Sequence, residues 1–139
     1  MKYLRRFNEG IKHEDFENLI LDIKDLNYEL GDMDVKMVIK PDPEKDPIGF
    51  NMLRHYLSDR LPDTGRAHSD FNVTFIGDFN KLTTDEGDNL VRIINHLKST
   101  LDGFGLVGEV MIGSEVIRLD GWLVTQLNVS KITIKITKK

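Results

Sequence analysis

The sequence predicts a single α+β domain, residues 1–139, in which about three helices pack on one face of a mixed or antiparallel sheet. Three segments carry apolar residues every three or four positions, the period of a helix with one buried face. Five others alternate apolar and polar residues or lie beside tight-turn signals, as strands do. The elements follow the order α-β-α-β-α-β-β-β, and 40% hydrophobic with 30% charged residues is ordinary for a globular domain of 139 residues.

Two helices are expected in the first half of the chain. Residues 13–30 place an apolar stripe from Phe16 to Leu30 on one side, and Gly31 is a suitable left-handed stop. Residues 47–61 follow Asp46, a good N-cap, and start with Pro47, whose fixed φ and missing N–H suit the first helical position.

The third helix, residues 83–103, has signals at both ends. Thr83 and Glu86 have the spacing of a capping box, in which each side chain pairs with a backbone N–H that the first turn leaves free. Gly103 is expected to take the left-handed conformation after the last turn. Gly113-Ser114 then suits a type II′ hairpin turn that pairs Ile112 with Glu115.

The strands are expected over residues 34–40, 71–76, 106–112, 115–119 and 131–137. In the hairpin of the third and fourth strands, Glu109 would face Arg118. For residues 122–127 a strand and irregular packing both stay open, and Trp122 is expected to fill core beside the Asp120-Gly121 turn.

The last strand is expected at an edge of the sheet. Its apolar residues are isoleucines that point inward, and its outward lysines would protect an edge from pairing with other chains. A partner strand, or a second copy of this chain, could nevertheless add there. The outward residues of this edge strand are Lys131, Thr133, Lys135 and Thr137.

Charge is unevenly distributed along the chain. The net charge of −4 argues against nucleic-acid binding, which usually needs a basic surface. Residues 13–34 are strongly acidic, whereas the C-terminus is basic. The outer face of the first helix could therefore dock a basic protein, or it could be a solvated face that keeps the protein in solution. Its candidate binding residues are Glu17, Asp22, Asp25 and Glu29.

No catalytic motif in the sequence lies in the structural context that its function requires. Residues 103–108 match G-x-G-x-x-G, but the helix precedes and the strand follows, the reverse of a dinucleotide-binding loop. The absence of cysteine excludes thiolate chemistry, and the four histidines lack metal-ligand spacing, so we expect no metal and no cofactor. An alternative is a small hydrolase or nucleic-acid-modifying enzyme with a loop site near His68 and Asp70.

The first nine residues, Met-Lys-Tyr-Leu-Arg-Arg-Phe-Asn-Glu, resemble the start of small uncharacterised proteins of tailed bacteriophages. The resemblance implies a phage origin and no family function. No catalytic residue is assigned, no segment has the length of a membrane span or the pattern of a signal peptide, and the host cytoplasm or the virion is the expected location. The sequence thus predicts a non-enzymatic accessory protein that binds another protein, either in a virion or as a modulator of a host factor.

Overall fold

The structure is a computed structural model that describes residues 13–58 and 71–138. Five antiparallel strands form one sheet in the order β1-β2-β5-β3-β4. The strands are β1 (Val35–Lys40), β2 (Asn72–Gly77), β3 (Leu106–Ile112), β4 (Glu115–Val116) and β5 (Lys131–Lys138). The predicted α+β class is confirmed, and of the two predicted kinds of sheet, mixed or antiparallel, the structure has the antiparallel one.

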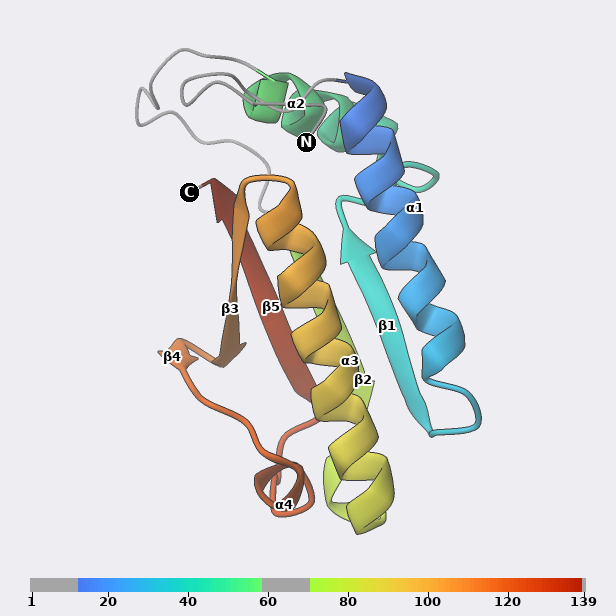
Figure 1. Ribbon diagram of the computed structural model, residues 1–139, viewed down its shortest axis with the longest axis vertical. Coiled ribbons are helices and arrows are strands. Elements are labelled where there is room, and N and C mark those ends of the chain that lie inside the picture. The colour runs from blue at the N-terminus through green and yellow to red at the C-terminus, as the bar shows by residue number, and fades with distance from the viewer. Residues whose placement is uncertain (1–12, 59–70, 139) are drawn as a thin grey trace.

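Two long helices, α1 (His13–Glu29) and α3 (Thr84–Gly103), lie side by side in front of the sheet and run in opposite directions (Figure 1). The shorter α2 (Pro47–Ser58) lies across one end of the pair. The chain also contains a 3₁₀ turn η1 (Phe79–Lys81) and a helical turn α4 (Gly121–Val124). The described helices thus belong to one layer, and none of them covers the other face of the sheet, which is called the open face below.

The core lies between this helix layer and the sheet. The strands contribute alternating side chains, because successive residues of a strand point to opposite faces. Fully buried core residues of the strands and helices include Val73, Phe75, Ile132, Ile134, Phe16, Leu19, Ile23, Leu90, Ile93, Leu97 and Leu101. At the α2 end, the ring of Phe16 lies 5.1 Å from that of Phe50 and 6.1 Å from that of Phe71. The aromatic contacts join α1, α2 and the start of β2.

The predicted start of α3 is confirmed, but the left-handed glycine after its last turn is not the predicted one. Thr83 accepts a hydrogen bond from the N–H of Glu86 at 3.1 Å, and the Glu86 carboxylate accepts one from the N–H of Thr83 at 2.9 Å. The helix includes Gly103, and the left-handed residue is Gly105, with φ +78°. Two glycines flank Phe104, so the chain can turn at the second one after a slightly longer helix.

The hairpin turn is confirmed, but the strand after it is shorter than predicted. Ile112 pairs with Glu115, and Gly113 has φ +62° while Ser114 does not take a positive φ, as a type II′ turn requires. β4 ends at Val116, however, and Glu109 faces Lys135 of β5 rather than Arg118.

The predicted edge position of the last strand is wrong. β5 lies between β2 and β3, so it is the central strand of the sheet and pairs on both sides. The edges are β1 and the two-residue β4. The lysines of β5 therefore do not protect an edge, because β5 has no free edge to which a partner strand could add. Their side chains project from the open face of the sheet.

The segment around Trp122 also differs from the prediction. Asp120 caps α4 by accepting a hydrogen bond from the N–H of Leu123 at 2.8 Å. The close approach of α4 to α3 explains the glycine at position 87, where a Cβ atom would lie 2.6 Å from the carbonyl oxygen of Gly121. Trp122 is 68% exposed and does not fill core, because the buried residues of this turn are Gly121 and Val124.

Candidate interaction surfaces

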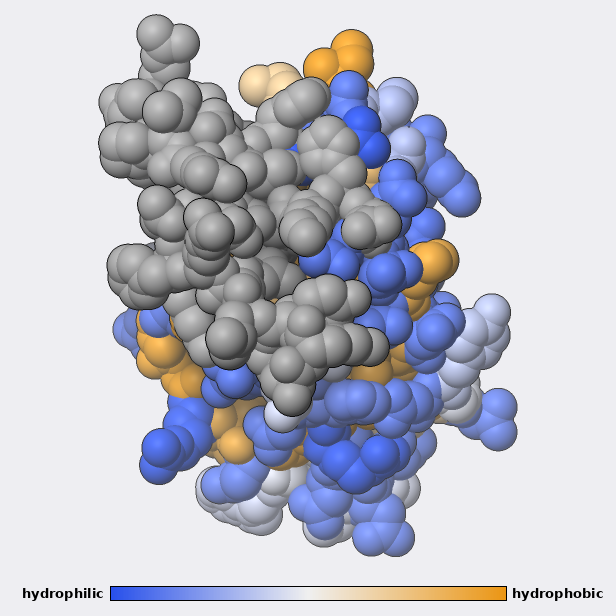
Figure 2. All heavy atoms as spheres, turned by 45° about the horizontal axis from the view of Figure 1, so that its top comes forward, coloured by the Kyte–Doolittle hydropathy of each residue, from blue (hydrophilic) through white to orange (hydrophobic). Residues whose placement is uncertain are grey.

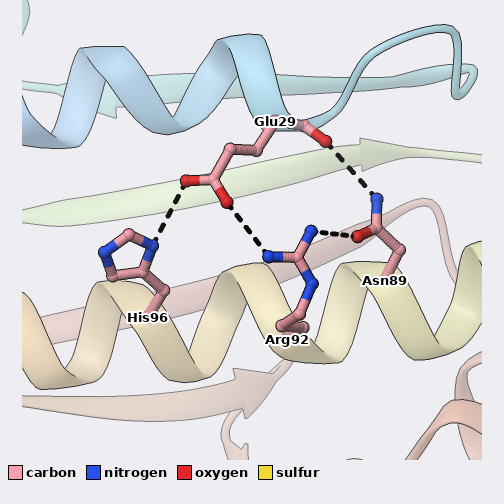
Figure 3. Close-up of polar contacts among 4 residues, drawn as sticks. All are labelled: Glu29, Asn89, Arg92 and His96. Carbon is pink, nitrogen blue, oxygen red and sulfur yellow. Dashed lines mark hydrogen bonds and ion pairs between the residues drawn. The ribbon is translucent and has the colours of Figure 1, made fainter.

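The four carboxylates expected to form an acidic docking face on α1 are not equivalent. Glu29 is the last residue of α1, and its side chain points toward α3. Its carboxylate oxygens are 3.3 Å from Nη1 of Arg92 and 3.2 Å from Nδ1 of His96 (Figure 3). The side-chain amide of Asn89 also donates to the backbone carbonyl of Glu29 at 3.4 Å. Glu29 therefore helps to join the two long helices.

Glu17 is also engaged within the molecule, since its carboxylate lies 3.5 Å from Nη1 of Arg54 on α2. Asp22 and Asp25 are exposed, and neither has an ion pair within the described part of the chain. Two apolar side chains on the same outer surface are also exposed, Leu21 by 59% and Tyr28 by 84%. Of the four candidate carboxylates of α1, only Asp22 and Asp25 have no ion pair within the described residues.

The open face of the sheet gathers the side chains that alternate with the core residues. On the two inner strands of this face, β2 contributes Asn72, Thr74 and Ile76, and β5 contributes the four residues predicted to line an edge. The pairing register places these side chains in rows that cross the strands.

The middle row consists of apolar side chains and two threonines. It runs across the whole sheet through Val38, Thr74, Thr133, Met111 and Val116, which occupy paired positions on successive strands. The hydroxyl groups of Thr74 and Thr133 lie 3.4 Å apart. Val38 is 39% exposed and Val116 is 59% exposed, so this row offers apolar surface to a partner.

The rows on either side are cationic. One row holds Lys36, Ile76 and Lys131, and the other holds Lys40, Asn72, Lys135 and Glu109. All four lysines are exposed, and none has an ion pair within residues 13–58 and 71–138. Four lysines against one glutamate make this face basic, whereas α1 on the opposite layer is acidic. The protein therefore has two surfaces of opposite charge, although its net charge is −4.

A groove lies along the outer flank of α3. Its larger part, about 680 Å³, is lined by apolar residues of α3, β3, β4 and the segment after β4, with Asn95, Lys98 and Arg118 as its polar residues. A smaller part, about 340 Å³, shares Asn95 and Lys98 and extends over residues 106–108 of β3. The groove exists because α1 and α3 leave the β3 side of the sheet without a third helix (Figure 1).

The described surface shows no large continuous apolar area on the side viewed in Figure 2. Hydrophilic side chains predominate there, with small hydrophobic patches between them. The described residues contain no group of three or more histidine, aspartate or glutamate side chains placed to hold a metal ion. None of the described helices has the length and apolar content to cross a membrane.

The candidate loop site near His68 and Asp70 lies outside the described residues. Of the other histidines, His96 contacts Glu29 in the interhelical network of Figure 3. The comparisons identify no family: no family model, no curated protein and no solved structure matches this chain.

Sequence reasoning missed the open face as a surface, although it had identified the side of each strand that points away from the core. The available signal was the recurrence of lysine at four-residue spacing on two separate strands, 36 and 40 on β1 and 131 and 135 on β5. Strand order was needed to bring these four lysines together.

Proposed function

We propose that this chain is a non-enzymatic accessory protein, encoded by a phage, that acts by binding another protein in a virion or on a host factor. The open face of the sheet is the binding surface. The phage origin rests on the resemblance of the first nine residues, and the binding role rests on the arrangement of side chains on this face.

The observation that carries the proposal is the apolar middle row between two cationic rows. Protein interfaces commonly have an apolar centre and a polar rim, and complementary charge at the rim selects the partner and speeds its association. A partner for this face therefore presents an apolar centre with carboxylates around it. The absence of aromatic side chains among the open-face residues of the described strands disfavours single-stranded nucleic acid, whose bases usually stack on such groups.

A basic partner on α1 is the weaker alternative. Glu17 and Glu29 already contact Arg54, Arg92 and His96, so a basic partner would have to compete with these internal contacts. An acidic partner on the open face would meet lysines that have no ion pair with any described residue.

The test compares two double variants that change the same number of charges on opposite layers. Lys36→Glu/Lys131→Glu reverses the cationic row beside Ile76, and Asp22→Lys/Asp25→Lys reverses the free carboxylates of α1. Lys135 is left unchanged because it faces Glu109, and a glutamate there would repel it. Unfolding in urea establishes first that both variants fold as the wild type does.

Each protein is immobilised and used to capture proteins from a bacterial lysate, and the captured protein is then identified and its affinity measured at several salt concentrations. We expect the sheet variant to lose an acidic partner by about tenfold or more in affinity, with the wild-type affinity falling as salt rises. The α1 variant should keep that partner. Capture of the same protein by the sheet variant, or loss only in the α1 variant, would refute the proposal.

A further inference from the structure

The outer side of β3 is paired over only part of its length. β4 pairs with Met111 and Ile112, and the N–H of Ile117 adds one hydrogen bond to the carbonyl of Val110 at 2.9 Å. Beyond Ile117 the chain leaves the sheet and leads to α4 (Figure 1). The first half of β3, from Leu106 to Glu109, therefore has β5 on one side and no described strand on the other.

The direction of the backbone groups follows from the bond at Val110. In an antiparallel strand, the N–H and C=O of one residue point to one side, and those of the next residue point to the other. Since the carbonyl of Val110 points toward β4, the N–H and C=O of Gly108 and Leu106 point outward as well. Neither residue has a hydrogen-bond partner on this side among the described residues.

These outward groups are recessed rather than fully solvated. Gly108 is buried, with the side chains of Leu101, Ile134 and Lys98 packed around its Cα atom, and Leu106 is 1% exposed. Buried backbone groups in folded proteins are nearly always paired. An additional strand in line with β4 would supply partners for the N–H and C=O groups of both residues.

The groove beside α3 has the position and chemistry to receive the side chains of such a strand. Its smaller part lies over residues 106–108, and its larger part continues along the apolar side chains of Val91, Ile94 and Ile117. Lys98 lies in both parts, and Arg118 lies in the larger part. Neither cation has an ion pair within the described chain. Asp102 adds a carboxylate to the lining of the smaller part, so an acidic residue of a ligand is favoured in the larger part, where Lys98 and Arg118 lie without a carboxylate beside them.

We propose that the outer edge of β3 at Leu106–Glu109 binds an extended peptide segment of a partner protein, with alternate apolar residues and an acidic residue directed into the groove. The peptide lies where β4 would continue and adds a strand to the sheet. Main-chain hydrogen bonds to Leu106 and Gly108 supply the attachment, and the groove supplies the preference for sequence. This site lies at the edge of the sheet, shares Val116 with the middle row of the open face, and does not depend on an acidic protein binding there.

The experiment selects ligands for the full-length protein from a library of random decapeptides. We expect enriched peptides with alternating apolar residues and at least one aspartate or glutamate. An enriched peptide is then tested by nuclear magnetic resonance, where the amide signals of Leu106 and Gly108 should shift and their hydrogen exchange should slow on binding. N-methylation of the peptide at alternate residues, in the frame that faces β3, should abolish binding.

Two variants with equal changes of charge distinguish the groove from the rest of the surface. Lys98→Glu/Arg118→Glu should weaken peptide binding by at least about tenfold, whereas Lys36→Glu/Lys131→Glu on the open face should leave it unchanged. The same pair separates the two proposals, because the groove variant should retain an acidic protein bound to the open face.

Several results would overturn the inference: failure of the library to enrich any peptide, equal peptide affinity for the groove variant and the wild type, or amide shifts confined to residues away from β3. Urea unfolding of the groove variant confirms that lost binding does not reflect lost structure.

Discussion

Truncation of Ile134 tests whether the inward face of β5 forms part of the core. Ile134 is fully buried and pairs with Val73 of β2 on one side and Val110 of β3 on the other. Replacing it with alanine removes Cγ1, Cγ2 and Cδ1 from the core. Their transfer to water costs about 2.4 kcal/mol, and the cavity left behind raises the expected loss of unfolding free energy to about 2–5 kcal/mol.

The assay is urea unfolding followed by far-ultraviolet circular dichroism, which suits this chain because its single tryptophan, Trp122, is already 68% exposed. Ile134→Val removes a single methyl group and should cost about 0.5–1.5 kcal/mol, which places it between the wild type and Ile134→Ala. The matched control is Val38→Ala on the edge strand, where the side chain is 39% exposed and the loss should stay below about 1 kcal/mol.

A place in the core for the inward face of β5 requires a clear gap between Ile134→Ala and the outward-facing Val38→Ala. If the two substitutions cost equal amounts, the inward face of β5 does not contribute to the core as the burial of Ile134 implies, and that placement would be refuted.

Four further substitutions probe local features. Gly87→Ala should destabilise the protein by about 1–3 kcal/mol in urea unfolding, because the new Cβ would meet the carbonyl oxygen of Gly121 at 2.6 Å. Gly103→Ala is the control: its new Cβ would have no atom within 4 Å, so the change should be neutral or stabilising by up to about 1 kcal/mol. The opposite ranking would contradict the close contact of α3 with α4. Thr83→Ala removes the capping box of α3 and should cost about 0.5–2 kcal/mol, and a loss near zero would mean that the cap contributes nothing. Glu29→Ala should cost about 0.2–1 kcal/mol, with a smaller effect in high salt because its partners are largely exposed, and a salt-independent loss would point to packing instead.

Local signals in the sequence were sufficient to place most elements. The capping box at Thr83, the proline at the start of α2 and the glycine of the β3–β4 turn each act within a few residues, so their effect can be predicted without knowledge of the fold. The side of each strand that faces the core was also predictable, since alternating burial depends on the sequence of that strand alone.

The candidate surfaces were less predictable, because each depends on contacts between distant segments. Glu29 is an acidic residue on an exposed helix in the sequence, and only the approach of α3 shows that Arg92 and His96 engage it. The length of β4 was overestimated for the same reason: Arg118 and Leu119 alternate well enough for a strand, but the chain must leave the sheet to bring α4 against α3.

The sequence by itself therefore determined the α+β class, the helices and strands, and the inward face of each strand, because these follow from the local period of apolar residues and from capping. Only the tertiary structure decided that β5 is central and that its lysines join those of β1 on one open face. Outward lysines look the same in sequence on an edge strand and on a central strand with one solvated face. The choice between them is made by which strands pair, and pairing is a property of the whole chain.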